Sequence, residues 1–122
     1  LLADDRQIVR EGLVSLLRAQ PDIEVVGEAT DGQMAVELTR QLRPDVVIMD
    51  VTMPRLNGIA ATRKIISDFP DVRVIGLSMH EEADLGVAMR QAGAVAFLSK
   101  DGPFDLLVST IYSSVRSLKH GQ

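Results

Sequence analysis

The sequence predicts an alternating α/β domain around a parallel sheet, on three observations. First, Pro-Asp pairs beginning at Pro21, Pro44 and Pro70 each follow a helix-like stretch and precede an apolar run. Because proline cannot continue a helix, these pairs mark repeated helix-to-strand transitions. Second, residues 46–49 are all apolar, as in a parallel strand buried on both faces. Third, 122 residues with 46% hydrophobic and 25% charged side chains suit one globular domain, expected over 1–122.

Five strand-like segments alternate with five helix-like segments. The expected strands are Leu1–Asp4, Glu24–Ala29, Asp45–Met49, Arg73–Leu77 and Ala94–Leu98. The expected helices are Gln7–Ala19, Gln33–Leu42, Gly58–Phe69, Ala83–Gln91 and Phe104–Lys119. This alternation predicts a flavodoxin-like (βα)5 doubly wound sheet with strand order 2-1-3-4-5. Its functional crevice would lie at the carboxyl ends of strands one and three.

Composition narrows the function classes. With no cysteine, the chain has neither disulfides nor thiolate chemistry, and a reducing cytoplasm is the expected location. No apolar run approaches the roughly 20 residues of a membrane span, so we expect no membrane role. The net charge of −4 argues against direct binding to a nucleic-acid backbone. Any contact with DNA would need a further output domain.

Three carboxylates fall at the predicted crevice. Asp4 and Asp5 end the first strand, and Asp50 follows the third. Like charges held close together disfavour full ionisation unless a cation balances them, and Mg²⁺ prefers oxygen ligands of this kind. A carboxylate can also attack phosphorus, and Asp50 is best placed to do so. Each aspartate alone is more simply explained as a turn residue at a strand end.

Three further residues follow or occupy strands near the same edge. Lys100 lies just beyond the fifth strand, where its ammonium can reach a phosphoryl oxygen or pair with Asp50. Ser78 follows the fourth strand and can donate a hydrogen bond to the same group. Phe97 lies in the fifth strand, where core packing is the simplest role. Taken singly, Lys100 and Ser78 are ordinary surface and loop residues.

In combination, these residues resemble the receiver domain of bacterial response regulators, the CheY-like family, over essentially the whole chain. The matching segments are Leu2–Asp5, Asp50–Gly58, Ser78 and Phe97–Lys100. The resemblance implies that Asp50 is the phosphorylation site. It implies a Mg²⁺ or Mn²⁺ site formed by Asp4, Asp5, Asp50 and the backbone carbonyl of Thr52.

The resemblance also implies a conformational switch. Ser78 would hydrogen-bond the phosphoryl group, Lys100 would pair with it, and Phe97 would reorient as Ser78 moves. Thr52 and His80 match variable positions beside the site that affect how fast the phosphoryl group is lost to water. Because Phe97 stands where many members have tyrosine, the hydrogen bond of that hydroxyl is missing here.

Three functions compete on the sequence alone. The first is a switch that takes a phosphoryl group from a sensor histidine kinase or phosphotransfer protein and is not a turnover enzyme. The second is an aspartyl phosphatase, although the sequence lacks a second acid two residues after Asp50. The third is an adaptor that binds partners without phosphorylation.

The opening segment, residues 2–13, and residues 77–80 are similar to the receiver branch joined to a LuxR-type helix-turn-helix domain. We therefore expect a receiver excised from a longer regulator, with a transcriptional output domain absent from this chain. Homodimerisation on phosphorylation is a further expectation. The cognate kinase, stimulus, target genes and dimer interface stay undetermined by the sequence.

Overall fold

A computed structural model describes residues 1–51, 53, 57–78 and 83–120. Its strands are β1 (Leu2–Ala3), β2 (Glu28–Ala29), β3 (Val46–Asp50), β4 (Arg73–Ser78) and β5 (Ala96–Ser99). Its helices are α1 (Gln7–Arg18), α2 (Gly32–Leu42), α3 (Gly58–Asp68), α4 (Ala83–Ala92) and α5 (Phe104–His120). Every expected element is present in the expected order.

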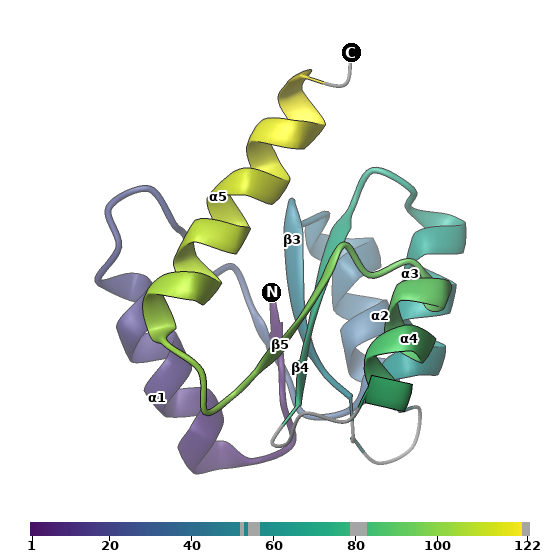
Figure 1. Cartoon of the computed structure of the whole chain (residues 1–122), viewed down its shortest axis with the longest axis horizontal. Coiled ribbons are helices and arrows are strands. Elements are labelled where there is room, and N and C mark those ends of the chain that lie inside the picture. The colour runs from purple at the N-terminus through teal and green to yellow at the C-terminus, as the bar shows by residue number, and fades with distance from the viewer. Residues whose placement is uncertain (52, 54–56, 79–82, 121–122) are drawn as a thin grey trace.

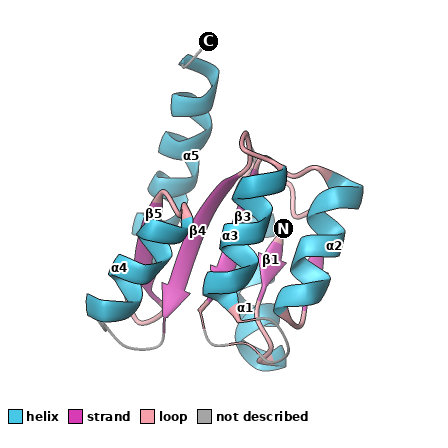
Figure 2. Ribbon diagram, turned by 90° about the vertical axis from the view of Figure 1, so that its right-hand side faces the viewer, coloured by secondary structure: helices cyan, strands magenta, loops and turns pink. Residues whose placement is uncertain are grey.

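The strands form one parallel sheet in the order β2-β1-β3-β4-β5, which confirms the flavodoxin-like prediction. Figure 1 shows α1 and α5 on one face of the sheet and α2, α3 and α4 on the other. The same three layers are seen from the side of α2, α3 and α4 in Figure 2. Because the sheet is covered on both faces, residues 46–49 of β3 and 74–77 of β4 are all apolar.

Two hydrophobic clusters stabilise these layers. One lies under α2, α3 and α4 and includes Val47, Met49, Ile65 and Val74, all fully buried or nearly so. The other lies under α1 and α5 and includes residues of β3 and β4 such as Ile48 and Ile75. Alternate side chains of β3 therefore enter opposite clusters, as the two-residue period of a strand requires.

The second strand is shorter than expected. The sequence predicts pairing over Glu24–Ala29, whereas only Glu28 and Ala29 are paired in β2. The physical reason is its partner, since β1 offers just Leu2 and Ala3 to the ladder, opposite Glu28 and Ala29. The expected strand boundaries were wrong here because strand length depends on the neighbouring strand.

Helix ends largely follow the sequence signals. Asn57 caps α3, because its side chain accepts a hydrogen bond from the amide of Ala60 at 2.9 Å. Asp31 caps α2 in the same way through the amide of Met34. The fifth helix begins at Phe104, directly after Pro103. Within the described ranges, no helix is long and apolar enough to cross a bilayer.

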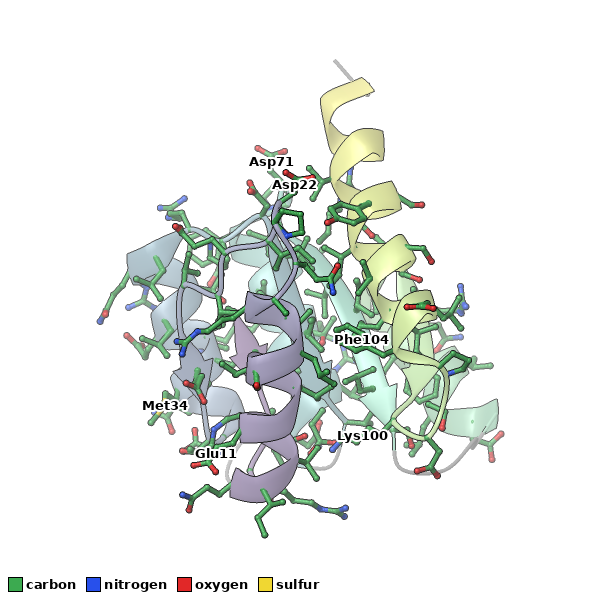
Figure 3. The ribbon with its side chains drawn as sticks, turned by 90° about the vertical axis from the view of Figure 1, so that its left-hand side faces the viewer. Glu11, Asp22, Met34, Asp71, Lys100 and Phe104 are labelled. Carbon is green, nitrogen blue, oxygen red and sulfur yellow. The ribbon has the colours of Figure 1, made fainter. Side chains whose placement is uncertain are left out.

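The predicted site residues lie at one end of the sheet only. Figure 3 shows Lys100 at the end of the molecule where the strands finish, and Asp22 and Asp71 at the opposite end. Asp71 directly precedes Val72 and the start of β4, while Lys100 directly follows β5. The residues singled out from the sequence therefore gather at the carboxyl end of the parallel strands.

Candidate functional site

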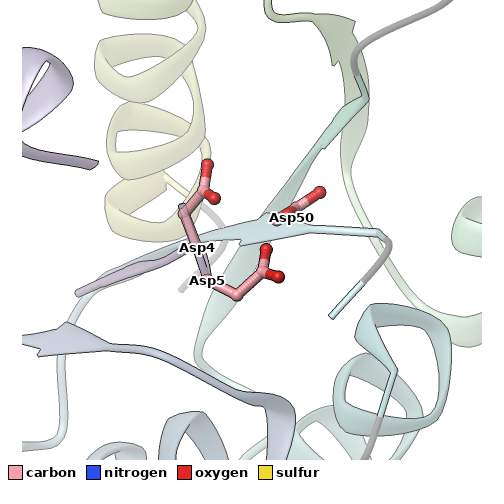
Figure 4. A group of neighbouring side chains, drawn as sticks. All are labelled: Asp4, Asp5 and Asp50. Atoms are coloured by element: carbon pink, nitrogen blue, oxygen red, sulfur yellow. The ribbon is translucent and has the colours of Figure 1, made fainter. Parts of the chain in front are cut away.

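Strand register brings the three predicted carboxylates together. Ala3 of β1 lies opposite Met49 of β3, so Asp4 and Asp50 follow at the same level. Asp4, Asp5 and Asp50 each offer an oxygen, and these oxygens lie within 4.8 Å of one another. Figure 4 shows the three side chains at the ends of the two strands. The folded chain thus brings the three carboxylates together. Asp4, Asp5 and Asp50 are called the acidic cluster below.

Burial makes the acidic cluster costly without a cation. Asp4 is 1% exposed and Asp50 is 2% exposed, whereas Asp5 is exposed. Carboxylates brought this close repel one another, and burial removes the water that would otherwise screen them. Two buried carboxylates beneath one open to solvent form a donor set for a hard divalent cation, which prefers oxygen ligands and retains waters. The cluster can hold such a metal.

Lys100 supplies a fixed positive charge to the acidic cluster. Its Nζ lies 2.7 Å from Oδ2 of Asp4 and 3.4 Å from Oδ2 of Asp50. The side chain is only 5% exposed, so water screens these pairs weakly. The sequence anticipated the pairing with Asp50. It did not anticipate that the shorter contact would be to Asp4.

Ser78 and Lys100 are linked through the backbone. The amide of Lys100 donates to the carbonyl of Ser78 at 2.7 Å, which extends the pairing of β4 with β5 by one step. Ser78 is buried, at 6% exposed. Since Asp50 lies opposite Leu77, Ser78 is one residue further along the same edge. A displacement of the Ser78 backbone would therefore also displace the segment that carries Lys100.

Phe97 packs inward between β4 and α4. Its side chain is partly buried against the cluster under α2, α3 and α4. A Cβ atom added to Gly76 would lie 2.9 Å from Phe97 Cδ1, and one added to Gly86 would lie 3.1 Å from Cδ2. Two glycines thus leave room for the ring. In this state, Phe97 is a packing residue.

The start of α3 lies tightly against the end of β3. The amide of Gly58 donates to the carbonyl of Val51 at 2.9 Å. A Cβ at Gly58 would lie 2.2 Å from the carbonyl oxygen of Asp50 and 2.8 Å from Cα of Val51. Glycine is favoured here for a steric reason, the close approach of two backbone segments.

Arg10 was not singled out from the sequence, yet it contacts the turn that carries two of the carboxylates. Its Nη1 donates to the backbone carbonyl of Asp4 at 2.8 Å, and its Nε donates to Oε1 of Glu28 at 3.1 Å. The available signal was weak, an arginine six residues after Asp4 and a glutamate near the end of the second expected strand. Only the fold brings the three together.

Thr52 and His80, predicted to flank the site, lie outside the described residues, as do Pro54, Arg55 and Leu56. The predicted metal ligand at the carbonyl of Thr52 is therefore not evaluated by the structure. Of the predicted site residues that the structure describes, Asp4, Asp5, Asp50, Ser78 and Lys100 all lie at the carboxyl edge of the sheet.

Comparisons with known proteins agree with this geometry. The model of the response regulator receiver domain family matches residues 1–112. The transcriptional regulatory protein DegU of Brevibacillus brevis is 39% identical over 91% of this chain and 47% of its own length. The response regulator UvrY of Escherichia coli strain K12 is 41% identical over the whole chain and 54% of its own length.

A solved structure shows the same fold. The signal receiver domain of the putative response regulator NarL from Mycobacterium tuberculosis superposes with a TM-score of 0.89 at 33% identity. That match covers 94% of this chain and 93% of the solved chain. By contrast, the chain spans about half the length of the curated relatives DegU and UvrY.

Proposed function

Because the chain belongs to the response regulator receiver family of two-component systems, we propose that Asp50 accepts a phosphoryl group from a partner phosphohistidine. The partner would be a sensor histidine kinase or a phosphotransfer protein. The observation that carries the proposal is the acidic cluster, with Asp50 at its buried centre and the Lys100 ammonium 3.4 Å from it. A structural role alone does not require such a concentration of charge.

The chemistry is a transfer from nitrogen to oxygen. An Asp50 carboxylate oxygen attacks phosphorus, an O–P bond forms, and the P–N bond to the donor imidazole breaks, leaving its electron pair on nitrogen. Lys100 would neutralise part of the negative charge on the phosphoryl oxygens, and the hydroxyl of Ser78 would donate a hydrogen bond to one of them. Burial of Asp50 keeps competing water away from the acyl phosphate.

The donor set supports a divalent cation at the acidic cluster. Asp4, Asp5 and Asp50 would hold Mg²⁺ or Mn²⁺, since hard cations of this kind prefer carboxylate and water oxygens. Such an ion supplies Lewis-acid neutralisation of the transferring phosphoryl group. A backbone carbonyl at Thr52 completes the proposed ligand set.

Phosphorylation would change the surface of the domain through new contacts between the phosphoryl group and the residues around it. We propose that Ser78 and Lys100 draw toward the phosphoryl group and that Phe97 leaves its inward position between Gly76 and Gly86. This repacking would change the face formed by α4, β5 and α5 and favour a homodimer. Since relatives such as DegU are transcriptional regulators, the proposed output is control of a separate DNA-binding domain in the cytoplasm.

The first test is intact mass spectrometry after incubation with Mg²⁺ and acetyl phosphate. The wild-type chain should acquire one phosphoryl adduct that is labile to alkali and hydroxylamine, as an acyl phosphate is, and Asp50→Ala should acquire none. Asp71→Asn serves as the matched control, because Asp71 is exposed at the opposite end of the sheet and should leave the adduct unchanged. Continuous hydrolysis of acetyl phosphate over many turnovers would point to a phosphatase instead. No adduct on the wild-type chain with Mg²⁺ or Mn²⁺ would favour the phosphorylation-independent adaptor.

A further inference from the structure

Arg10, in the first half of α1, contacts the turn between β1 and α1 and also the neighbouring strand β2. Its guanidinium contacts two partners, the carbonyl of Asp4 at 2.8 Å and the carboxylate of Glu28 on β2 at 3.1 Å. The Arg10 side chain is 13% exposed, whereas that of Glu28 is 37% exposed. A planar guanidinium offers donors in a fixed fork, so one side chain can hold both partners in one orientation.

The contacted carbonyl belongs to the peptide that joins Asp4 to Asp5. Because the peptide group is planar, fixing this carbonyl fixes the direction in which the Cα of Asp5 leaves the strand. The same residue is held at two other points. The Asp4 amide donates to the carbonyl of Ala29 at 3.0 Å, and its Oδ1 accepts from the amide of Arg6 at 2.9 Å.

Asp5 depends on this backbone more than its neighbours do. Asp4 and Asp50 are buried and contact Lys100, whereas Asp5 is exposed on a bend after β1. Packing therefore does little to orient its carboxylate. The Asp4–Asp5 peptide fixes where the Cα of Asp5 lies, and this position, together with the φ angle of Asp5, limits where its oxygens can reach.

From these contacts we infer that Arg10, braced by Glu28, is a positioning residue that presents the Asp5 carboxylate to the divalent cation. The inference rests on the proposed metal site and adds a determinant of its affinity. The charge of Arg10 by itself would act in the opposite direction, because a cation near the acidic cluster repels a second cation. Glu28 offsets that charge while leaving the hydrogen bond to Asp4 intact.

The positioning role and the charge of Arg10 have opposite effects on Mg²⁺ affinity, so measuring that affinity distinguishes them. The Mg²⁺ dissociation constant of the folded chain would be measured at constant ionic strength from amide shifts in NMR spectra. If Arg10 positions Asp5, Arg10→Met weakens Mg²⁺ binding about 10-fold, as expected for a residue that orients a metal ligand. Arg10→Lys keeps one donor for the Asp4 carbonyl and should recover part of the affinity. If Arg10 acts only as a charge, Arg10→Met binds Mg²⁺ more tightly than Arg10→Lys.

Two further variants isolate the parts of the contact. Glu28→Gln keeps the bond from Arg10 to Asp4 but leaves the guanidinium charge unbalanced, so Mg²⁺ binding should weaken about two- to threefold. Arg40→Met is the matched control, because Arg40 pairs with Glu37 on an exposed face of α2 and should leave Mg²⁺ affinity unchanged. At saturating Mg²⁺, Arg10→Met should take up phosphoryl from acetyl phosphate at nearly the wild-type rate.

Each outcome decides between the two proposals. Saturable Mg²⁺ binding in the wild type with equal or tighter binding in Arg10→Met overturns the positioning role and leaves the metal site standing. A wild-type chain that binds neither Mg²⁺ nor Mn²⁺ overturns the metal site and the positioning role together. If Arg10→Met fails to fold, Arg10→Lys is compared with the wild type instead. The inference is then rejected if neither Arg10→Lys nor Glu28→Gln changes the Mg²⁺ dissociation constant.

Discussion

At the scale of single residues, the acidic cluster holds three negatively charged side chains close enough to repel one another. Three carboxylates with oxygens within 4.8 Å share the Lys100 ammonium, which contacts Asp4 and Asp50. One ammonium offsets only part of this repulsion in the metal-free protein, and a bound divalent cation would offset the remainder. The stability of the chain should report this balance directly.

Neutralising Asp5 tests that balance. Because Asp5 is exposed and adds to the repulsion, Asp5→Asn should raise the free energy of unfolding of the metal-free chain by up to about 1 kcal/mol. For the wild type, Mg²⁺ at 100 times its dissociation constant should add about 2.7 kcal/mol, and most of this gain should vanish in Asp5→Asn. Urea unfolding with Mg²⁺ or with EDTA measures both. A variant less stable than wild type without metal would contradict the repulsion.

At the scale of elements, the join between β3 and α3 determines where Asp50 lies. The first residue of α3, Gly58, sits against the backbone of Asp50 and Val51, and Asn57 caps the helix at the same point. Backbone atoms cannot rotate away as a flexible side chain can. The close approach at Gly58 is therefore a requirement of the site as well as of the helix.

Gly58→Ala should show this requirement. The new Cβ would meet the Asp50 carbonyl oxygen, so the chain should lose about 2 kcal/mol of unfolding free energy and accept phosphoryl more slowly. Gly12→Ala is the matched control, since Gly12 lies within α1 with no atom within 4 Å of an added Cβ. That change should stabilise the chain by about 0.5–1 kcal/mol. Chemical denaturation and phosphorylation time courses compare the two, and equal stability would refute the steric argument.

At the scale of the whole molecule, the sheet has to be covered on both faces for its edge to hold a site. The cluster under α1 and α5 and the cluster under α2, α3 and α4 share β3 and β4 as their common wall. Loss of packing on either face would loosen the strands that carry Asp50 and Ser78. Stability and site geometry are coupled through this wall.

The same substitution at two isoleucines separates core from surface. Ile75 is fully buried in β4, so Ile75→Ala should lower the free energy of unfolding by about 2–5 kcal/mol through lost burial and a residual cavity. Ile8 on α1 is 86% exposed, and Ile8→Ala should change it by no more than about 0.5 kcal/mol. Thermal or urea unfolding checks both values. Comparable losses would mean that the Ile8 side chain is covered in solution.

The sequence by itself determined the fold class, the order of the elements and the residues at the carboxyl edge. These follow from local signals, namely apolar runs such as 46–49, helical periodicity and proline at helix ends. Even the candidate site could be predicted, because Asp50, Ser78 and Lys100 each directly end or follow a strand, and parallel strands finish at one edge.

Tertiary structure alone decided which of these groups touch. Lys100 contacts Asp4 across 96 positions of sequence, Arg10 joins Asp4 to Glu28, and β2 is limited to the length that β1 can pair. No local pattern encodes such contacts, because they depend on the register between strands and on how far α1 packs against the sheet. Periodicity specifies which face a side chain takes, whereas only packing in three dimensions fixes its neighbours.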